Sequence, residues 1–247
     1  MVHFLLSQRA EVMLSAKPDA WKPPGLTEVS IALQQIECPP VDSFIVFLTT
    51  YGGLQYNPYI QHGKRFYQVQ FSPLPGRFPL DLREVVSKVN NDWVLDLGVH
   101  HRLGQFGFCL DTSGRVLWEY EIPIFSSIEH LIESDALENM LGQVEGRWIW
   151  VSGITHSDPS TILDTLIDLQ KVTEASGQWN TWWIGDGLFV RYFLSWEWGD
   201  RPRVLWIYAQ SSSNLNRLLM QLRPIFKKPP VLRSWPFVAS ETDQSAW

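Results

Sequence analysis

The residues best suited to metal or nucleophilic chemistry lie between positions 96 and 111. His100 and His101 are adjacent, with Asp96, Cys109 and Asp111 nearby in the sequence. Adjacent residues on a strand point to opposite faces, so the two imidazoles could not easily bind one metal ion. Cys-x-x-Cys and His-Glu-x-x-His spacings are absent. We therefore predict no metal site and no cofactor.

Cys109 is also the strongest candidate nucleophile. It would need an exposed, electropositive environment to act as a thiolate. Phe108 and Leu110 flank it, and this apolar setting favours a structural thiol. Glu119 and Glu121 could share a strand face as a carboxylate pair, but solvated strand residues explain them equally well. No Gly-x-Ser-x-Gly is found. We expect a protein that is not an enzyme.

The charge distribution favours binding over catalysis. Residues 1–146 carry 10 Lys+Arg against 17 Asp+Glu, a balance of −7, and residues 147–247 carry 10 against 9, a balance of +1. An acidic surface complements a basic partner. The predicted partner-binding residues are acids expected to be exposed and two tyrosines near the Gly52-Gly53 pair: Tyr51, Tyr56, Asp111, Glu119 and Glu121.

A second candidate surface is the segment 201–233, which has seven Lys and Arg and no acidic residue. Basic side chains can neutralise phosphates while an indole stacks on bases. The predicted anion-binding residues are Arg217, Arg223, Lys227 and Lys228. A solvated basic helix beside buried tryptophans explains the same pattern.

Tryptophan is concentrated in the second half, where ten of the 13 lie at or beyond Trp148. Trp182 and Trp183 are adjacent, so on a strand they point to opposite faces. We expect one set of tryptophans to pack in the core. The other set would meet a helix, a second domain or a partner.

Periodicity, caps and turn residues predict the elements of the first half. Gly52-Gly53 should end the second helix, and Ser126-x-x-Glu129 should open the last helix as a capping box. Asp111 to Gly114 should form a hairpin turn. Helices are predicted at 26–35, 41–51, 80–89 and 126–141, and strands at 66–71, 93–97, 106–110 and 115–120.

The second half is predicted as a similar mixture. Helices are expected at 157–175 and after Ser211–Ser213, and strands at 147–154, 188–196 and 204–209. A loose tail is expected after 229, apart from Trp235 and Phe237. The fold class is α+β, with an antiparallel-rich sheet flanked by helices and domains at 1–145 and 146–247. Arg115-Val-Leu-Trp-x-Tyr120 recurs as Arg203-Val-Leu-Trp-x-Tyr208, which allows two related modules.

Targeting signals are not evident. The first residues lack a basic region, and the longest uncharged run, 43–63, is interrupted by glycines and Pro58. Two cysteines are too few for a disulfide framework. We predict a cytoplasmic protein with no membrane partner.

The order of motifs between residues 26 and 141 resembles the SUKH superfamily. The features are a helix at 26–35, Pro39-Pro40, a second helix ending at Tyr51-Gly-Gly53, a hairpin at 107–118 and a closing helix at 126–141. Residues after 146 would then be a degenerate second copy. The resemblance implies an α+β binding fold without catalytic residues. It also implies that the protein grips a partner, often a nuclease or deaminase toxin.

Two functions from different classes follow. The first is a non-catalytic, immunity-type protein that neutralises a basic toxin such as a nuclease. The alternative is a regulatory or viral scaffold that binds nucleic acid or a host protein through residues 201–233.

Overall fold

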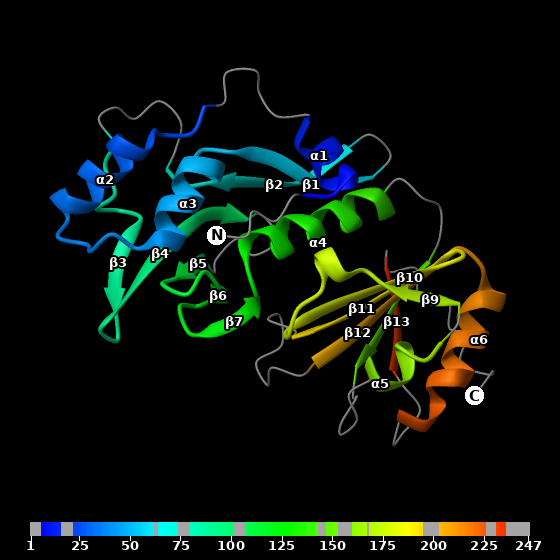
Figure 1. Ribbon diagram of the computed structural model, residues 1–247. Coiled ribbons are helices and arrows are strands. Elements are labelled where there is room, and N and C mark those ends of the chain that lie inside the picture. The colour runs from blue at the N-terminus through cyan, green and yellow to red at the C-terminus, as the bar shows by residue number, and fades with distance from the viewer. Residues whose placement is uncertain are drawn as a thin grey trace. The chain divides into compact units, whose positions relative to one another are not determined.

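The protein has an α+β fold made of helices and two antiparallel sheets (Figure 1). A computed structural model describes residues 6–15, 22–61, 64–73, 80–100, 107–142, 147–152, 160–166, 168–194, 203–225 and 231–235. The chain divides into two compact units, residues 1–143 and 144–247.

The first unit contains four described helices and a seven-stranded sheet. Its strands run in the order β1-β2-β4-β5-β6-β7, with β3 paired to β4, and all pairs are antiparallel. The helices are α1 (Gln8–Ser15), α2 (Leu26–Gln35), α3 (Asp42–Tyr51) and α4 (Ile128–Leu141). The strands are β1 (Gln55–Gln61), β2 (Lys64–Phe71), β3 (Val86–Val89), β4 (Asp92–His100), β5 (Phe108–Asp111), β6 (Val116–Trp118) and β7 (Ile122–Phe125).

Helix α3 ends where the glycine pair predicted. Gly53 has φ +75°, a left-handed conformation that glycine adopts without a steric penalty. Gly52 is needed for a different reason, because a Cβ there would lie 2.4 Å from the Leu48 carbonyl oxygen. The apolar face of α3 buries Phe44, Phe47 and Leu48.

Helix α4 is also confirmed, with a cap shifted by one residue. Ser127, rather than Ser126, is the N-cap, and its hydroxyl accepts from the His130 amide (3.3 Å). The predicted apolar side is buried, as Ile128, Leu131, Ile132, Leu137 and Leu141 show.

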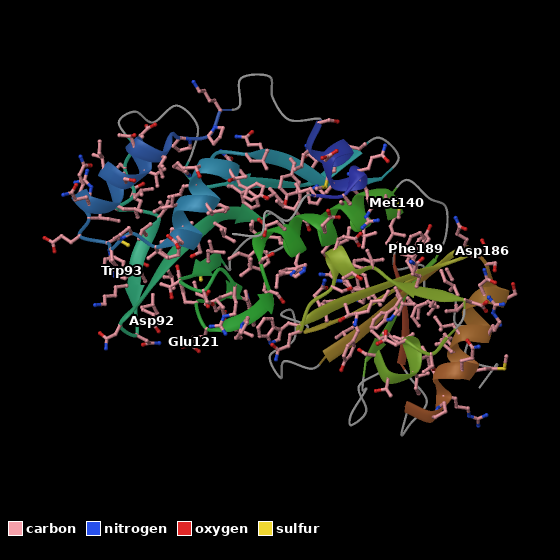
Figure 2. All side chains as sticks on the ribbon, in the orientation of Figure 1. Asp92, Trp93, Glu121, Met140, Asp186 and Phe189 are labelled. Atoms are coloured by element: carbon pink, nitrogen blue, oxygen red, sulfur yellow. The ribbon has the colours of Figure 1, made fainter. Side chains whose placement is uncertain are left out.

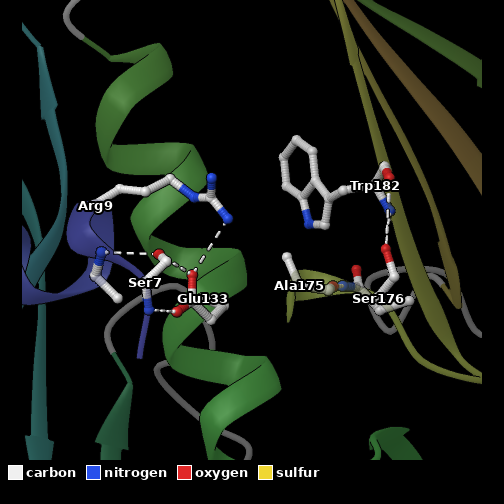
Figure 3. A network of polar contacts seen from close by, with 8 residues as sticks. Ser7, Arg9, Glu133, Ala175, Ser176 and Trp182 are labelled. Carbon is white, nitrogen blue, oxygen red and sulfur yellow. Dashed lines mark hydrogen bonds and ion pairs between the residues drawn. The ribbon is translucent and has the colours of Figure 1, made fainter. Parts of the chain in front are cut away.

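Acidic residues of α4 are buried as well, which the sequence did not predict. Glu133 accepts hydrogen bonds from the backbone amide and the hydroxyl of Ser7, the latter at 2.6 Å, and lies 3.5 Å from the Arg9 guanidinium (Figure 3). The buried carboxylate therefore holds the start of α1, whose Ala10 and Met13 are also buried. Contacts of α1 with α4 and β1 complete this packing.

The predicted helix at 80–89 is wrong. Leu80 and Leu82 are buried in irregular structure, and residues 86–89 form β3, which pairs with the start of β4. Leu80, Leu82 and Val86 are buried, and their spacings of two and four residues are compatible with a strand as well as with a helix. The hairpin at Asp111 to Gly114 is confirmed, with φ +87° at Gly114.

The second unit is built on a six-stranded antiparallel sheet in the order β13-β8-β12-β11-β10-β9. The strands are β8 (Arg147–Ser152), β9 (Leu169–Lys171), β10 (Asn180–Gly185), β11 (Leu188–Leu194), β12 (Arg203–Ala209) and β13 (Val231–Trp235). The helices are α5 (Ser160–Leu163) and α6 (Ser212–Leu222), with 3-10 turns η2 (Thr173–Ala175) and η3 (Arg223–Ile225).

Trp182 and Trp183 point to opposite faces of this sheet. Trp183 packs in a core with α5 and α6, and its indole N–H donates to Asp164 (2.7 Å). On the other face, the Arg191 guanidinium lies 5.2 Å from the Trp182 ring and 5.5 Å from the Trp206 ring. Both sets are buried, so no exposed tryptophan patch exists among the side chains that the structure describes.

Two predictions for the second half are corrected, and a third stays untested. Among the described residues of the predicted helix 157–175, only 160–163 are α-helical, and β9 and η2 follow. The tail after 229 contains β13, which pairs with β8. The repeated motif is a strand of three residues in β6 but of seven in β12. The strand orders of the two sheets differ, so a relation between modules stays a prediction.

Candidate protein-binding surface

The two tyrosines predicted to contact a partner are buried. Tyr56, 2% exposed, donates its hydroxyl to Asp135 of α4 (2.7 Å). Tyr51 donates to Glu129, one turn and a half earlier on α4 (3.2 Å). Burial and the neighbouring carboxylates raise the pKa of both phenols. Both tyrosines are buried, and each hydroxyl joins α3 or β1 to α4, so a role as contacts with a partner has no support here.

Asp111 is also buried, at 8% exposure, so the prediction of an exposed acid is wrong there too. Its carboxylate accepts from the Ser113 hydroxyl (2.7 Å), the Arg115 amide (2.8 Å) and the Arg115 guanidinium (2.7 Å). These bonds close the turn between β5 and β6, a role that short acidic side chains commonly have.

The remaining two predicted residues, Glu119 and Glu121, lie in the turn between β6 and β7. We call residues 119–121 the acidic turn. Tyr120, at its centre, is 43% exposed, and Glu121 is exposed (Figure 2 labels Glu121). The two glutamates were expected on one strand face, but β6 ends at Trp118 and the Glu121 amide donates to the Trp118 carbonyl (3.2 Å). Neither carboxylate has a hydrogen bond or ion pair within the described residues.

The backbone of the acidic turn is unusual for its residue types. Glu119 and Tyr120 have φ +50° and +65°. Two successive positive φ values are typical of a type I′ turn, for which Asn and Gly are the favoured residues. The turn between β3 and β4 has the same feature at Asn90 and Asn91, where φ is +49° and +71°. Asparagine tolerates this conformation, but for a glutamate or a tyrosine it costs about 1 kcal/mol each.

Next to the acidic turn lie Asp96 of β4 and Cys109 of β5, which are register partners. Burial raises the pKa of Asp96, although its carboxylate accepts the Gly98 amide at 2.7 Å. Burial also raises the pKa of the Cys109 thiol, to about 12. Burial, and then the neighbouring Asp96 and Cys109, raise the pKa of Tyr120. A thiol with so high a pKa is protonated at neutral pH and does not act as a nucleophile.

The two predicted anion-binding residues that the structure describes, Arg217 and Arg223, do not form one site. Arg217 of α6 forms an ion pair with Asp168 (3.4 Å), which reduces its capacity for an external anion. Arg223 is exposed six residues later, so the two side chains do not share a helix face. Lys227 and Lys228 lie outside the described residues. The alternative function stays a prediction.

The described part of the chain holds neither a candidate metal centre nor a membrane span. No three His, Cys, Asp or Glu side chains gather there as a set of metal ligands. His101 and the His100 side chain lie outside that part. None of the helices described is both long and apolar enough to span a bilayer.

Comparison with protein-family profiles, with curated proteins and with solved structures gives no match for this chain. The α+β class therefore rests on the elements and sheets described above.

Sequence reasoning missed Tyr120 as a candidate contact. The sequence pattern extends a strand through residue 120, and a glutamate followed by a tyrosine carries no turn signal. An aromatic residue between two glutamates was the available signal, because tyrosine is enriched at interface hot spots.

Replacing Tyr56 by phenylalanine should lower the stability of the protein without changing its affinity for a partner. The change removes a buried hydrogen bond to a carboxylate, so the free energy of unfolding should fall by about 1.5–3 kcal/mol. Tyr51→Phe, whose bond is longer and less buried, should cost about 0.5–1.5 kcal/mol. Chemical denaturation measures both losses. If either variant keeps the stability of the parent but loses partner binding, the tyrosine is a direct contact with the partner.

Asp96→Asn should raise stability at pH 7. The pKa of Asp96 is raised in the folded state, so ionisation costs stability as pH rises from the ordinary value of 3.8 through the folded value. The asparagine oxygen still accepts the Gly98 amide and carries no charge. The stability gain, followed by thermal unfolding, should therefore disappear below about pH 4. Asp92→Asn, at an exposed position of β4, controls for removal of one negative charge. A gain independent of pH would contradict this assignment.

Proposed function

We propose that this chain is a non-catalytic, cytoplasmic protein of the immunity type, which binds and neutralises a basic protein toxin such as a nuclease. The acidic turn is the proposed contact. It presents a half-exposed tyrosine between two glutamates, within residues 1–146, where 17 acidic residues outnumber 10 basic ones. Acidic and aromatic side chains together complement a basic surface.

The observation that carries the proposal is the strain in the turn. The same sheet contains an asparagine turn of similar backbone, so the fold can make this connection with favourable residues. The β6–β7 turn instead has Glu119 and Tyr120 at its two left-handed positions, which lowers the stability of the fold. Strained backbone of this kind is frequent at functional sites. Here the strained positions present two carboxylates without an intramolecular partner and an exposed phenol to solvent.

The resemblance to the SUKH superfamily supports the same function. The motifs that carry it correspond to α2, the Pro39-Pro40 break, α3 with its glycine stop, the β5–β6 hairpin and α4. The buried Tyr51 and Tyr56 belong to the framework of this arrangement, and Glu119 and Glu121 are the predicted contacts that lie at the surface.

Co-expression with the product of the adjacent gene tests the function. We expect that product to stop growth when expressed alone, and expect this chain to restore growth and to elute with it as one complex. Steered association should weaken as salt is raised. Growth arrest that persists, with no complex at low salt, would refute the proposal.

Replacing Glu119 and Tyr120 of the acidic turn by Asn and Gly separates the effect on binding from the effect on stability. The double variant Glu119→Asn, Tyr120→Gly keeps a type I′ turn and should raise the free energy of unfolding by about 1 kcal/mol, because the backbone strain it relieves outweighs the packing of the two side chains it removes. The same variant should weaken the toxin complex at least tenfold, about 1.4 kcal/mol, as measured by calorimetry.

The matched control is Asn91→Gly in the β3–β4 turn. It also relieves a positive φ and should leave toxin affinity unchanged. If the double variant binds as tightly as the parent, the acidic turn is not the contact. If it unfolds more easily than the parent, the strain argument fails.

A further inference from the structure

A second surface of the first unit lies along α2, well separated in sequence from the acidic turn. A groove of about 470 Å³ is lined by α2 and the segment that follows it, through Ser30, Leu33, Gln34, Glu37, Cys38, Pro39 and Pro40. We call this the α2 groove. Its lining is mostly apolar, with Glu37 as the one residue in it that carries a formal charge.

Helix α2 leaves two apolar side chains exposed, and one of them, Leu26, is on the same face as the groove. Leu26 is 61% exposed and Ile31 is 51% exposed, although Val29, Ala32 and Leu33 of the same helix are buried. Leu26 lies one turn before Ser30, whose hydroxyl donates to the Leu26 carbonyl (2.9 Å). Residues four apart share a helix face, so Leu26 extends the groove toward the start of α2.

Helix α2 ends with a glutamate, Glu37, at a backbone position that usually holds glycine. The Cys38 amide donates to the Leu33 carbonyl (3.0 Å) and the Glu37 amide to the Gln34 carbonyl (3.1 Å), which together make a Schellman motif. Glu37 therefore occupies the left-handed position, with φ +59°. Glycine is the usual residue there. Glu37 is exposed and its carboxylate makes no interaction within the described residues.

No residue that lines the groove carries a positive charge. The last turn of α2 holds no basic residue, and the sequence from Pro23 to Gly63 has no Lys or Arg but includes Glu28, Glu37 and Asp42. The carbonyl end of a helix adds partial negative charge. A ligand that fits must therefore be apolar along Leu26, Pro39 and Pro40 and positively charged near Glu37.

From this complementarity we infer that the α2 groove is a docking site for a short segment of a partner protein that carries an apolar side chain followed by an arginine or lysine. The apolar side chain covers Leu26 and the exposed Pro39 and Pro40. The cation pairs with the carboxylate of Glu37, which occupies a left-handed position where glycine is the usual residue. This site is independent of the acidic turn.

A random linear-peptide display library, selected on the full chain, tests the site. The enriched peptides should combine apolar residues with arginine or lysine. Anisotropy of the best labelled peptide should show binding weakened about two- to fivefold by Glu37→Gln, the loss expected for an exposed ion pair. Leu26→Ser should weaken it about tenfold. Absence of enrichment above the starting library would overturn the proposal.

Glu37→Gly distinguishes a binding role from a structural one. Both Glu37 variants lose the carboxylate, but only the glycine relieves the left-handed backbone. We expect equal losses of peptide affinity and a higher midpoint of thermal unfolding for Glu37→Gly alone. Equal affinity of the parent and both variants would overturn the assignment of Glu37.

Two further outcomes identify other occupants. A dimer of the full chain that dissociates with Leu26→Ser would make the groove a contact between copies and would overturn the peptide site. Peptide binding that is lost in the Glu119→Asn, Tyr120→Gly variant would place the peptide on the acidic turn instead. If the peptide still binds this variant, the α2 groove is supported as the peptide site even when the variant no longer binds the toxin.

Discussion

The first unit depends on carboxylates that are buried in helix α4. An ionised side chain is costly to bury unless it is paired or hydrogen-bonded. Here the buried Asp135 accepts the phenol of Tyr56, and the buried Glu133 accepts the amide and hydroxyl of Ser7. Glu129, which is only partly buried, accepts the phenol of Tyr51. Each bond joins α4 to an element that is distant in sequence. The acidic helix thereby fixes the ends of α1, α3 and β1.

This arrangement separates two uses of acidic and aromatic residues in one unit. Tyrosines and acids that meet each other, such as Tyr56 and Asp135, are buried and position the elements. Those held on strained backbone, such as Glu119, Tyr120 and Glu37, lie partly or fully in solvent. Left-handed backbone costs stability for side chains with a Cβ. Its presence at surface positions where Asn or Gly would fold better is the basis for both proposed surfaces.

The sequence predicted elements where local signals are strong. Helix α3 carries its own stop at Gly52-Gly53, and the β5–β6 hairpin has Gly114 in its turn. Signals were weak for β1 and β13, and α5 proved much shorter than its apolar spacing suggested. Strand pairing depends on partners far along the chain, which local periodicity does not report.

The candidate site was harder to predict for the same reason. The burial of Tyr56 depends on Asp135, 79 positions away, and no local pattern around either residue shows that they meet. Glu119 and Glu121 were selected for their charge and do lie at the surface, although in a turn instead of on a strand. The turn was missed because its residues contradict the usual preference.

Hydrogen exchange of the full chain, with and without the product of the adjacent gene, tests the central claim most directly. The account predicts that the bound state slows exchange at residues 119–121 and the adjoining ends of β6 and β7, and leaves the amides around Tyr56 and Asp135 unchanged. Protection confined to α6, with none at the acidic turn, would contradict it.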